Sequence, residues 1–218
     1  MHHCRAGFER ECAAELAEVT AREGITGHVR AREGDALALF AAPSAGAATR
    51  MSAALAASRL VFTRQSFLSS GLLEELPSDD RVSPMVAAAR ALEPPFDDFF
   101  VEHADSDDGR RLARLCRSLR PPLRAALGAA GLLAPRERSG RRLHLLLPSA
   151  TSFYPGRART DASSPWPMGI PRLKLPRGAP SRSALKLEEA LLVMASAQLR
   201  DEWLRPGRSA VDLGASPG

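Results

Sequence analysis

The sequence predicts an α/β protein with an α+β N-terminal part, in which two small domains precede the beginning of a Rossmann-like domain. Three observations support this. Residues 1–68 show a β-α-β-β-α-β order, residues 83–160 alternate helices and strands again, and a closing buried strand ends in an acid followed by Gly-x-x-x-Gly at 214–218. Such a strand and glycine-rich turn are typical of the place where a Rossmann-like sheet leaves its first strand. The 218 residues are enough for more than one hydrophobic core.

The first domain, residues 1–72, is expected to contain a short strand, a helix, two strands, a second helix and a last strand. Apolar spacing and turn residues place the elements after the short strand at Phe8–Arg22, Ile25–Arg32, Ala36–Ala41, Ala45–Ala57 and Leu60–Phe62. This order is that of the ferredoxin-like split βαβ fold. Because the fold hosts many unrelated activities, it predicts no function by itself.

The second domain, residues 73–160, is expected to start with an acidic linker, Leu73–Asp80. Its elements are predicted as a helix from Ser83 through Leu92, a strand at Phe96–His103, helices at Gly109–Leu119 and Leu123–Leu133, and a buried strand at Leu143–Leu147. Pro121 and Pro122 are expected to separate the two later helices, because proline lacks a backbone N–H and clashes with the preceding turn. His144, within the last strand, is interpreted as a satisfied structural histidine.

The stretch Thr151–Pro180 contains six prolines and is expected to be rigid, extended and basic, with residues 161–180 forming a linker. The same stretch could also lie against single-stranded RNA through phosphate contacts and base stacking on Phe153, Tyr154 and Trp166. Residues 181–218 then predict a helix from about Ser183 and a strand at Ser209–Leu213. The buried stripe of that helix is expected at Leu187, Leu191, Met194 and Leu199.

Charge is distributed very unevenly along the chain. Residues 109–182 contain 16 Lys and Arg against two acids, a net +14, whereas the whole chain is +5 and the remainder is therefore −9. Such an uneven distribution of charge suits the binding of a polyanion, and a nucleic acid fits better than a small acidic metabolite. An arginine row on one helix is also typical of an ordinary solvated face, but the excess continues into non-helical segments without interleaved acids. The residues expected to contact RNA are Arg110, Arg114, Arg117, Arg124, Arg141, Arg142, Arg172 and Lys174.

Several classes of protein are disfavoured. The three cysteines, Cys4, Cys12 and Cys116, are odd in number and match no zinc spacing, so we expect reduced thiols and no metal site. The sequence contains no apolar run of about 18 residues, the length needed to span a membrane. The opening residues offer no secretory hydrophobic region, so a cytosolic protein is expected.

Two motifs near the end carry a family resemblance. Ser-Arg-Ser-Ala-Leu-Lys-Leu begins at Ser181, and Asp-Leu-Gly-Ala-Ser-Pro-Gly begins at Asp212. Together they resemble the Ser-Arg-x-x-x-Lys-Leu helix and the Asp-Leu-Gly-x-x-Pro-Gly motif of the FtsJ-like RNA ribose 2′-O-methyltransferases. Within that group the whole chain resembles the bacterial large-subunit (23S) ribosomal RNA ribose methyltransferase M family, with further matching stretches at Cys4–Cys12, Pro122–Leu127 and Met168–Lys174.

The resemblance implies a ferredoxin-like and THUMP region that holds RNA, followed by a Rossmann-like domain at 181–218 that binds S-adenosyl-L-methionine. The implied partner is 23S ribosomal RNA, with no DNA or membrane partner and a monomeric chain. Lys186 matches a lysine that helps hold and polarise the ribose 2′-hydroxyl, a poor nucleophile that needs a positioned amine nearby. The implied cofactor residues are Ser183, Asp212, Gly214, Ser216, Pro217 and Gly218.

The sequence departs from the family pattern in two ways. Ser216 stands where the family more often has cysteine, a small-for-small change. The central catalytic lysine and the acid that would bind the cofactor ribose are expected downstream of Gly218. The 218 residues taken alone are therefore expected to bind RNA without catalysis.

Two other functions remain open at this point. One is a stand-alone RNA-binding module without a catalytic domain. The other is a nucleotide-dependent dehydrogenase, which fits the terminal glycines but lacks Gly-x-Gly-x-x-Gly and leaves the basic segment unexplained.

Overall fold

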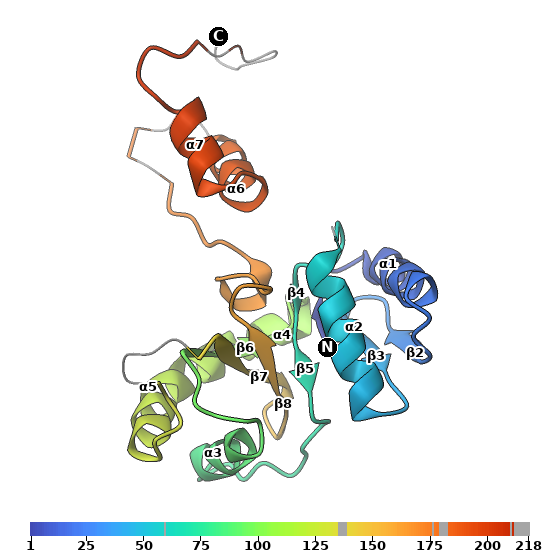
Figure 1. Cartoon of the computed structure of the whole chain (residues 1–218). Helices are drawn as coiled ribbons and strands as arrows, with labels where there is room; N and C mark the ends of the chain where they lie inside the picture. The colour runs from blue at the N-terminus through green and yellow to red at the C-terminus, as the bar shows by residue number, and fades with distance from the viewer. Residues whose placement is uncertain (59, 135–138, 176, 179–182, 210, 212–218) are drawn as a thin grey trace. The chain divides into compact units, whose positions relative to one another are not determined.

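The computed structural model describes residues 1–58, 60–134, 139–175, 177–178, 183–209 and 211 of the chain. The chain divides into two compact units, Met1–Ile170 and Pro171–Gly218. The first unit contains two four-stranded sheets, which are seen in Figure 1 as the blue-to-cyan and green-to-orange parts of the chain.

The first sheet has the strand order β2-β3-β1-β4, with every neighbouring pair antiparallel. Its strands and helices are β1 His2–His3, α1 Glu9–Arg22, β2 His28–Ala31, β3 Leu37–Ala41, α2 Ala45–Ala57 and β4 Gln65–Ser66. The connectivity confirms the ferredoxin-like split βαβ expected from the sequence. Leu16 and Val19 of α1 and Met51 and Leu55 of α2 form its core with Ala38 of β3.

The last strand of this domain lies later than expected. Leu60–Phe62 was predicted as a buried strand, but Val61 is 80% exposed and the strand is Gln65–Ser66. The carboxylate of Glu15 on α1 accepts the backbone N–H groups of Val61, Phe62 and Thr63. A side chain therefore uses the donors that a strand would have given to the sheet.

The second sheet has the order β5-β8-β7-β6, in which β6 and β7 are parallel and the other pairs are antiparallel. Its elements are β5 Leu68–Ser69, α3 Val82–Arg90, β6 Asp98–His103, α4 Asp107–Arg111, α5 Ala113–Ala129, β7 Arg141–Ser149, β8 Ser152–Arg159 and the 3₁₀ turn η1 Pro167–Gly169. Alternate residues of β7 face opposite sides, as strand geometry requires. Leu143, Leu145 and Leu147 join the core under α3 and α5, whereas Leu146 packs against Phe67 of the first domain.

Helix α5 runs through the two prolines that were expected to break it. Cys116, Leu119, Leu123 and Leu127 form one continuous buried stripe across the Pro121–Pro122 step. The carbonyls that lose an N–H donor belong to Arg117 and Ser118, which are exposed to water. Packing of one apolar face against the sheet thus overrides the local effect of the prolines.

Ser152–Arg159 form the strand β8, where the start of a rigid, extended segment was expected. Phe153 in β8 is 1% exposed within the helix-covered core, so its ring is not available for base stacking. Pro155 has no backbone N–H to donate. It still fits the strand because its carbonyl accepts a hydrogen bond from the Ser70 N–H. The predicted acidic linker also contributes to this domain, since Leu76 is buried in the same core.

The second unit contains two short helices, α6 Ala184–Met194 and α7 Ala197–Trp203, where a single helix was expected. Ser196 caps α7, and the Arg200 guanidinium donates to the carbonyls of Leu191, Leu192 and Ala195 at the end of α6. The predicted buried stripe is not formed within the described part of this unit, where Leu187 is 66% and Met194 85% exposed. No sheet covers it there, and most of the predicted strand at Ser209–Leu213 lies outside the described residues.

Candidate nucleic-acid interface

The solvent side of α5 carries a row of arginines. Ser106 caps the preceding α4, and the buried stripe of α5 from Cys116 to Leu127 fixes which side of the helix faces outward. Four arginines lie exposed along it, at positions 114, 117, 120 and 124. At about 1.5 Å rise per residue they extend over roughly 15 Å of helix.

These four arginines have no acidic partner among the described residues. Helix α5 contains no Asp or Glu, whereas the neighbouring Arg110 pairs with Asp105 at 3.8 Å and Asp107 at 3.1 Å. Arg111 likewise pairs with Asp108 at 3.1 Å. The guanidinium of Arg124 lies 5.1 Å from the Phe99 ring centre. The positive charge of α5 is therefore free to meet an anion, which is the usual electrostatic signature of a nucleic-acid surface.

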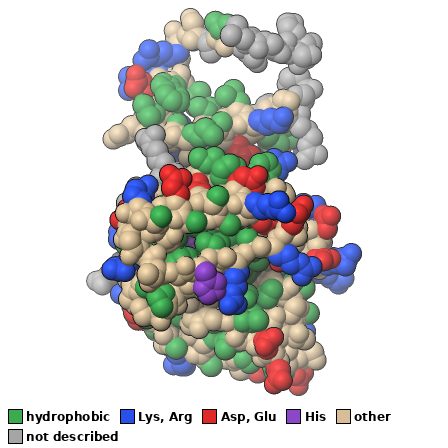
Figure 2. Space-filling model, turned by 90° about the vertical axis from the view of Figure 1, so that its right-hand side faces the viewer, with side chains coloured by type: hydrophobic (Ala, Val, Ile, Leu, Met, Phe, Trp, Pro, Cys, Tyr) green, Lys and Arg blue, Asp and Glu red, His purple; other side chains and the backbone are tan. Residues whose placement is uncertain are grey.

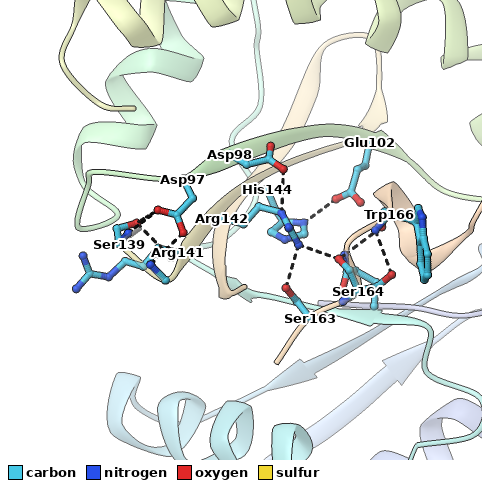
Figure 3. A network of polar contacts seen from close by, with 12 residues as sticks. Asp97, Asp98, Glu102, Ser139, Arg141, Arg142, His144, Ser163, Ser164 and Trp166 are labelled. Carbon is cyan, nitrogen blue, oxygen red and sulfur yellow. Dashed lines mark hydrogen bonds and ion pairs between the residues drawn. The ribbon is translucent and has the colours of Figure 1, made fainter. Parts of the chain in front are cut away.

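Arg141 and Arg142, the next predicted RNA contacts, have different positions. Arg141 is half-buried and donates to the Glu93 carbonyl at 3.3 Å. Arg142 is buried, with its Nε 3.4 Å from Asp98 and its Nη1 bonded to Ser163 and Ser164 at 3.2 and 2.8 Å (Figure 3). Its guanidinium also covers the Phe100 ring at 4.4 Å. Arg142 is thus an internal link and not part of the exposed basic face.

A groove of about 1020 Å³ lies between α2 and β4 on one side and the ends of β7 and β8 on the other. Its lining includes Arg64, Arg141, Arg157 and Arg159 together with many Ser and Thr hydroxyls. Three of these arginines already pair with acids, Arg64 with Asp105 at 3.1 Å, Arg157 with Glu93 at 2.8 Å and Arg159 with Asp161. The groove therefore offers less free charge than α5.

The ferredoxin-like domain shows no comparable excess of charge. Residues 1–67 contain eight Arg and seven acids. Figure 2, which looks onto the side of the molecule at the right of Figure 1, shows basic and acidic side chains interspersed over the coloured atoms. The candidate interface is therefore a property of the second domain.

A buried carboxylate, Glu102, lies between the two domains and was not foreseen from the sequence. Its Oε2 accepts from His144 Nδ1 at 2.8 Å (Figure 3) and lies 3.8 Å from His3 Nε2. Burial by itself would raise the pKa of Glu102, but the attraction and the hydrogen bond of His144, with His3 nearby, outweigh it and hold the pKa well below its usual range. The only sequence signal was an acid within the apolar run of β6.

The predicted catalytic and cofactor residues lie in the second unit or outside the described chain. Lys186 is exposed on α6, and its backbone N–H donates to the Ser183 carbonyl at 3.0 Å. Arg172 and Lys174 are exposed in the segment before α6. The remaining predicted cofactor residues fall outside the described residues: Asp212, Gly214, Ser216, Pro217 and Gly218.

The described part of the chain contains no cluster of three or more His, Cys, Asp or Glu side chains arranged to hold a metal ion. None of its helices combines the length and the apolar character needed to cross a membrane.

The first unit is thus an α/β structure in which a ferredoxin-like domain packs on a second domain, and the arginines along α5 of that domain have no acidic partner among the described residues. Two family models match this chain, the RlmM ferredoxin-like domain over residues 1–67 and the N-terminal domain of ribosomal RNA large subunit methyltransferase M over residues 80–159. The chain belongs to the ribosomal RNA large subunit methyltransferase M family.

Curated relatives agree with this assignment over nearly the whole chain. Ribosomal RNA large subunit methyltransferase M of Methylococcus capsulatus is 46% identical over 99% of this chain and 60% of its own length. The proteins of the same name from Cellvibrio japonicus and Cronobacter sakazakii are 44% and 42% identical, again over 99% of this chain and over 61% and 59% of theirs. The chain thus spans about three-fifths of the length of these relatives.

Among solved structures, TrmN from Thermus thermophilus matches with a TM-score of 0.39 and 16% identity, over 72% of this chain and 43% of that one. A likeness this slight supports no conclusion about the fold.

Proposed function

We propose that this chain is the RNA-holding part of an S-adenosyl-L-methionine-dependent enzyme that methylates a ribose 2′-hydroxyl of large-subunit (23S) ribosomal RNA. The single observation that supports it most is the unpaired arginine row of α5 in a chain of this family. The relatives are named ribosomal RNA large subunit methyltransferases, which points to the same RNA as substrate. We also assign the second domain, residues 73–160, as the THUMP-like part.

In this proposal the first unit binds RNA by its phosphates. Arg114, Arg117 and Arg124 of α5 contact the backbone, and Arg110 adds to the field from α4. Phosphate contacts fix the orientation of the RNA without reading its sequence. Arg172 and Lys174, exposed beyond the first unit, extend the basic path along the chain.

Methyl transfer itself needs residues of the second unit. Lys186 places an exposed amine on α6, where it would hold and polarise the 2′-hydroxyl. S-adenosyl-L-methionine would supply the methyl group, with Ser183 and the 212–218 stretch contributing to its site. The described part of the chain brings together no group that could complete this reaction, so RNA binding without catalysis is the activity proposed for these 218 residues taken alone.

The test is RNA binding measured against salt. Replacing Arg114, Arg117, Arg120 and Arg124 by glutamine in the full chain should weaken binding of a large-subunit RNA fragment. The slope of log K against log salt should fall by about 0.7–0.9 for each phosphate that is no longer neutralised, because each neutralised phosphate releases condensed counterions. Filter binding or fluorescence anisotropy at several salt concentrations gives this slope.

A matched variant controls for the loss of charge. Four exposed arginines of the ferredoxin-like domain serve for this control: Arg10, Arg30, Arg32 and Arg50. Their replacement by glutamine removes the same number of positive charges. This control should keep most of the affinity and of the slope. Equal losses in both variants, or wild-type binding without a salt slope, would contradict the proposal.

A further inference from the structure

The segment from Ser163 to Ile170 is fixed on the seam between the two domains of the first unit. Gln65 of β4 is 2% exposed, and its Oε1 accepts the Ser164 N–H at 2.9 Å. Its Nε2 donates to the carbonyls of Ser164 at 3.2 Å and Trp166 at 3.4 Å. A buried side chain of the ferredoxin-like domain thus satisfies the backbone of a segment that comes after the second domain.

Glu102 of the second domain holds the next residues of the segment. Its Oε1 accepts the backbone N–H of Met168, while its Oε2 is held by His144. Met168 has φ +59°, a left-handed conformation that is costly for a residue with a side chain. The contact to Glu102 is one of the interactions that keep the backbone in that conformation.

Gly169 brings the segment against the backbone of the first domain. A Cβ at this position would lie 2.3 Å from the Arg64 carbonyl oxygen, and φ is +70°. Only glycine fits both the contact and the conformation. The last residues of the first unit are therefore held by both domains, Gln65 and Arg64 from one and Glu102 and Arg142 from the other.

A buried carboxylate at this point requires a reason. Burying a charge is unfavourable unless it is paired and hydrogen-bonded, and apolar residues of similar volume are often at least as stabilising. Glu102 directs one oxygen at the backbone of the exit segment and the other at a buried histidine. A residue with two such partners specifies one position for the segment, which an apolar contact would not do.

We propose that Glu102, acting with Gln65 and Gly169, is a positioning residue that fixes the point where the chain leaves the RNA-holding unit toward residues 171–218. The inference rests on the proposed function, because its benefit is to methyl transfer. A tether that starts from a fixed point keeps the residues beyond it at a higher effective concentration near bound RNA than a free one. Loss of the anchor should therefore reduce turnover and leave RNA affinity unchanged.

Two substitutions in the full-length protein test this inference. Glu102→Leu removes both hydrogen bonds at nearly constant volume, and Gly169→Ala pushes the segment away while leaving Glu102 intact. Each should speed amide hydrogen exchange at Met168–Ile170, leave the RNA Kd within twofold, and lower kcat about tenfold or more. Glu102→Gln keeps an oxygen for the Met168 N–H and a polar group for His144, so it should restore most of kcat at neutral pH.

Further variants keep the result interpretable. Gly46→Ala, on α2 at an ordinary helical φ and with only the Ser44 Oγ near the added Cβ, at 3.9 Å, is the matched control and should change none of the three readouts. Inserting Gly-Ser repeats after Ile170 leaves the anchor intact but frees the residues beyond it, so kcat should fall without faster exchange at Met168. This variant also tests the inference if Glu102→Leu fails to fold.

The failures of the two proposals are distinguishable. Faster exchange at Met168–Ile170 with unchanged kcat in Gly169→Ala would overturn the positioning role and leave the proposed function standing. Wild-type protein that binds RNA without a salt slope would overturn the proposed function, while the exchange measurement would still report on the anchor.

Discussion

Glu102 shows at the scale of one residue how polar side chains line the contact between the two domains. It is buried between them and has His144 on one oxygen and the Met168 N–H on the other. Arg142 lies two positions before His144, on the same face of β7, and links Asp98 to Ser163 and Ser164. Polar side chains that would normally be solvated thus form the inner lining of the seam.

This arrangement predicts a specific dependence of stability on pH. The pKa of Glu102 is lowered in the folded state, so the unfolded state binds more protons in acid. The stabilisation by Glu102 is fully present above its unfolded pKa, near 4.5, and decreases as the pH falls below that value. The free energy of unfolding should therefore be measured with urea at several pH values between 7 and 3. Plotted against pH, it should rise more steeply for the wild type than for Glu102→Gln, by up to about 1.4 kcal/mol per pH unit.

The exposed Glu11 on α1 provides the comparison for that measurement. Glu11→Gln removes one carboxylate from the surface of α1 and so serves as the matched control for the loss of a single negative charge. Identical slopes for wild type and Glu102→Gln would contradict the prediction.

The burial of a residue could be predicted from the sequence where a local pattern determines it. It could not be predicted where it depends on a partner far away in the chain. His144 was expected to be a satisfied structural residue because it lies within an apolar strand, and it is buried with Glu102 as its partner. Glu102 and Gln65 were not singled out, since nothing near them in the chain shows that Met168 or Ser164 would lie opposite. Arg142 was taken for a surface residue because Asp98 is 44 positions away.

At the scale of elements, α5 shows where local rules were overridden. The apolar spacing predicted both halves of the helix, but the Pro121–Pro122 step was misjudged. The structure also begins α5 at Ala113, after the separate α4, and ends it at Ala129, whereas the second helix was expected to reach Leu133. Leu119 before the step and Leu123 after it bury themselves against the same sheet. In the ferredoxin-like domain Ala45–Ala57 was predicted with its observed bounds, because Ser44 provides an ordinary N-cap and no distant contact is needed.

Replacing Pro121 by alanine should stabilise the protein. Alanine restores an N–H donor to the Arg117 carbonyl and removes the ring clash, which outweighs the lost restriction of the unfolded chain. We expect the free energy of unfolding to rise by about 1–2 kcal/mol, less than the full helix penalty of proline because the native helix has adapted. Urea denaturation at constant pH measures it.

Pro84 in the first turn of α3 is the matched control. The N–H groups of the first turn have no intrahelical partner, so Pro84→Ala should give no gain. A Pro121→Ala variant that is no more stable than Pro84→Ala would show that the carbonyls near the step are already satisfied by water.

For the whole molecule, the fold shows where the unpaired positive charge of the basic segment lies. The excess of +14 within residues 109–182 includes arginines with internal roles, such as Arg142, and arginines paired with acids, such as Arg157. Of the arginines described at positions 109–170, the exposed ones without an acidic partner lie on α5. The composition therefore led to the prediction of a polyanionic partner, but only the fold shows which arginines lack an acidic partner.

The seam predicts that the two domains of the first unit open together. Phe67, at the end of the first domain, stacks on His144 of β7 with ring centres 4.8 Å apart and is buried with Leu146. Phe67→Ala should lower the opening free energy by about 3 kcal/mol, the usual cost of removing a buried aromatic ring. Because both sheets contribute to the site, hydrogen exchange should show the same loss at Leu39 in β3 and at Leu145 in β7. Phe8→Ala, which removes an exposed ring just before α1, should change neither by more than about 1 kcal/mol. A loss confined to one of the two sheets would mean that the domains open independently, and then Glu102 would lose its protected setting whenever the first domain opened alone.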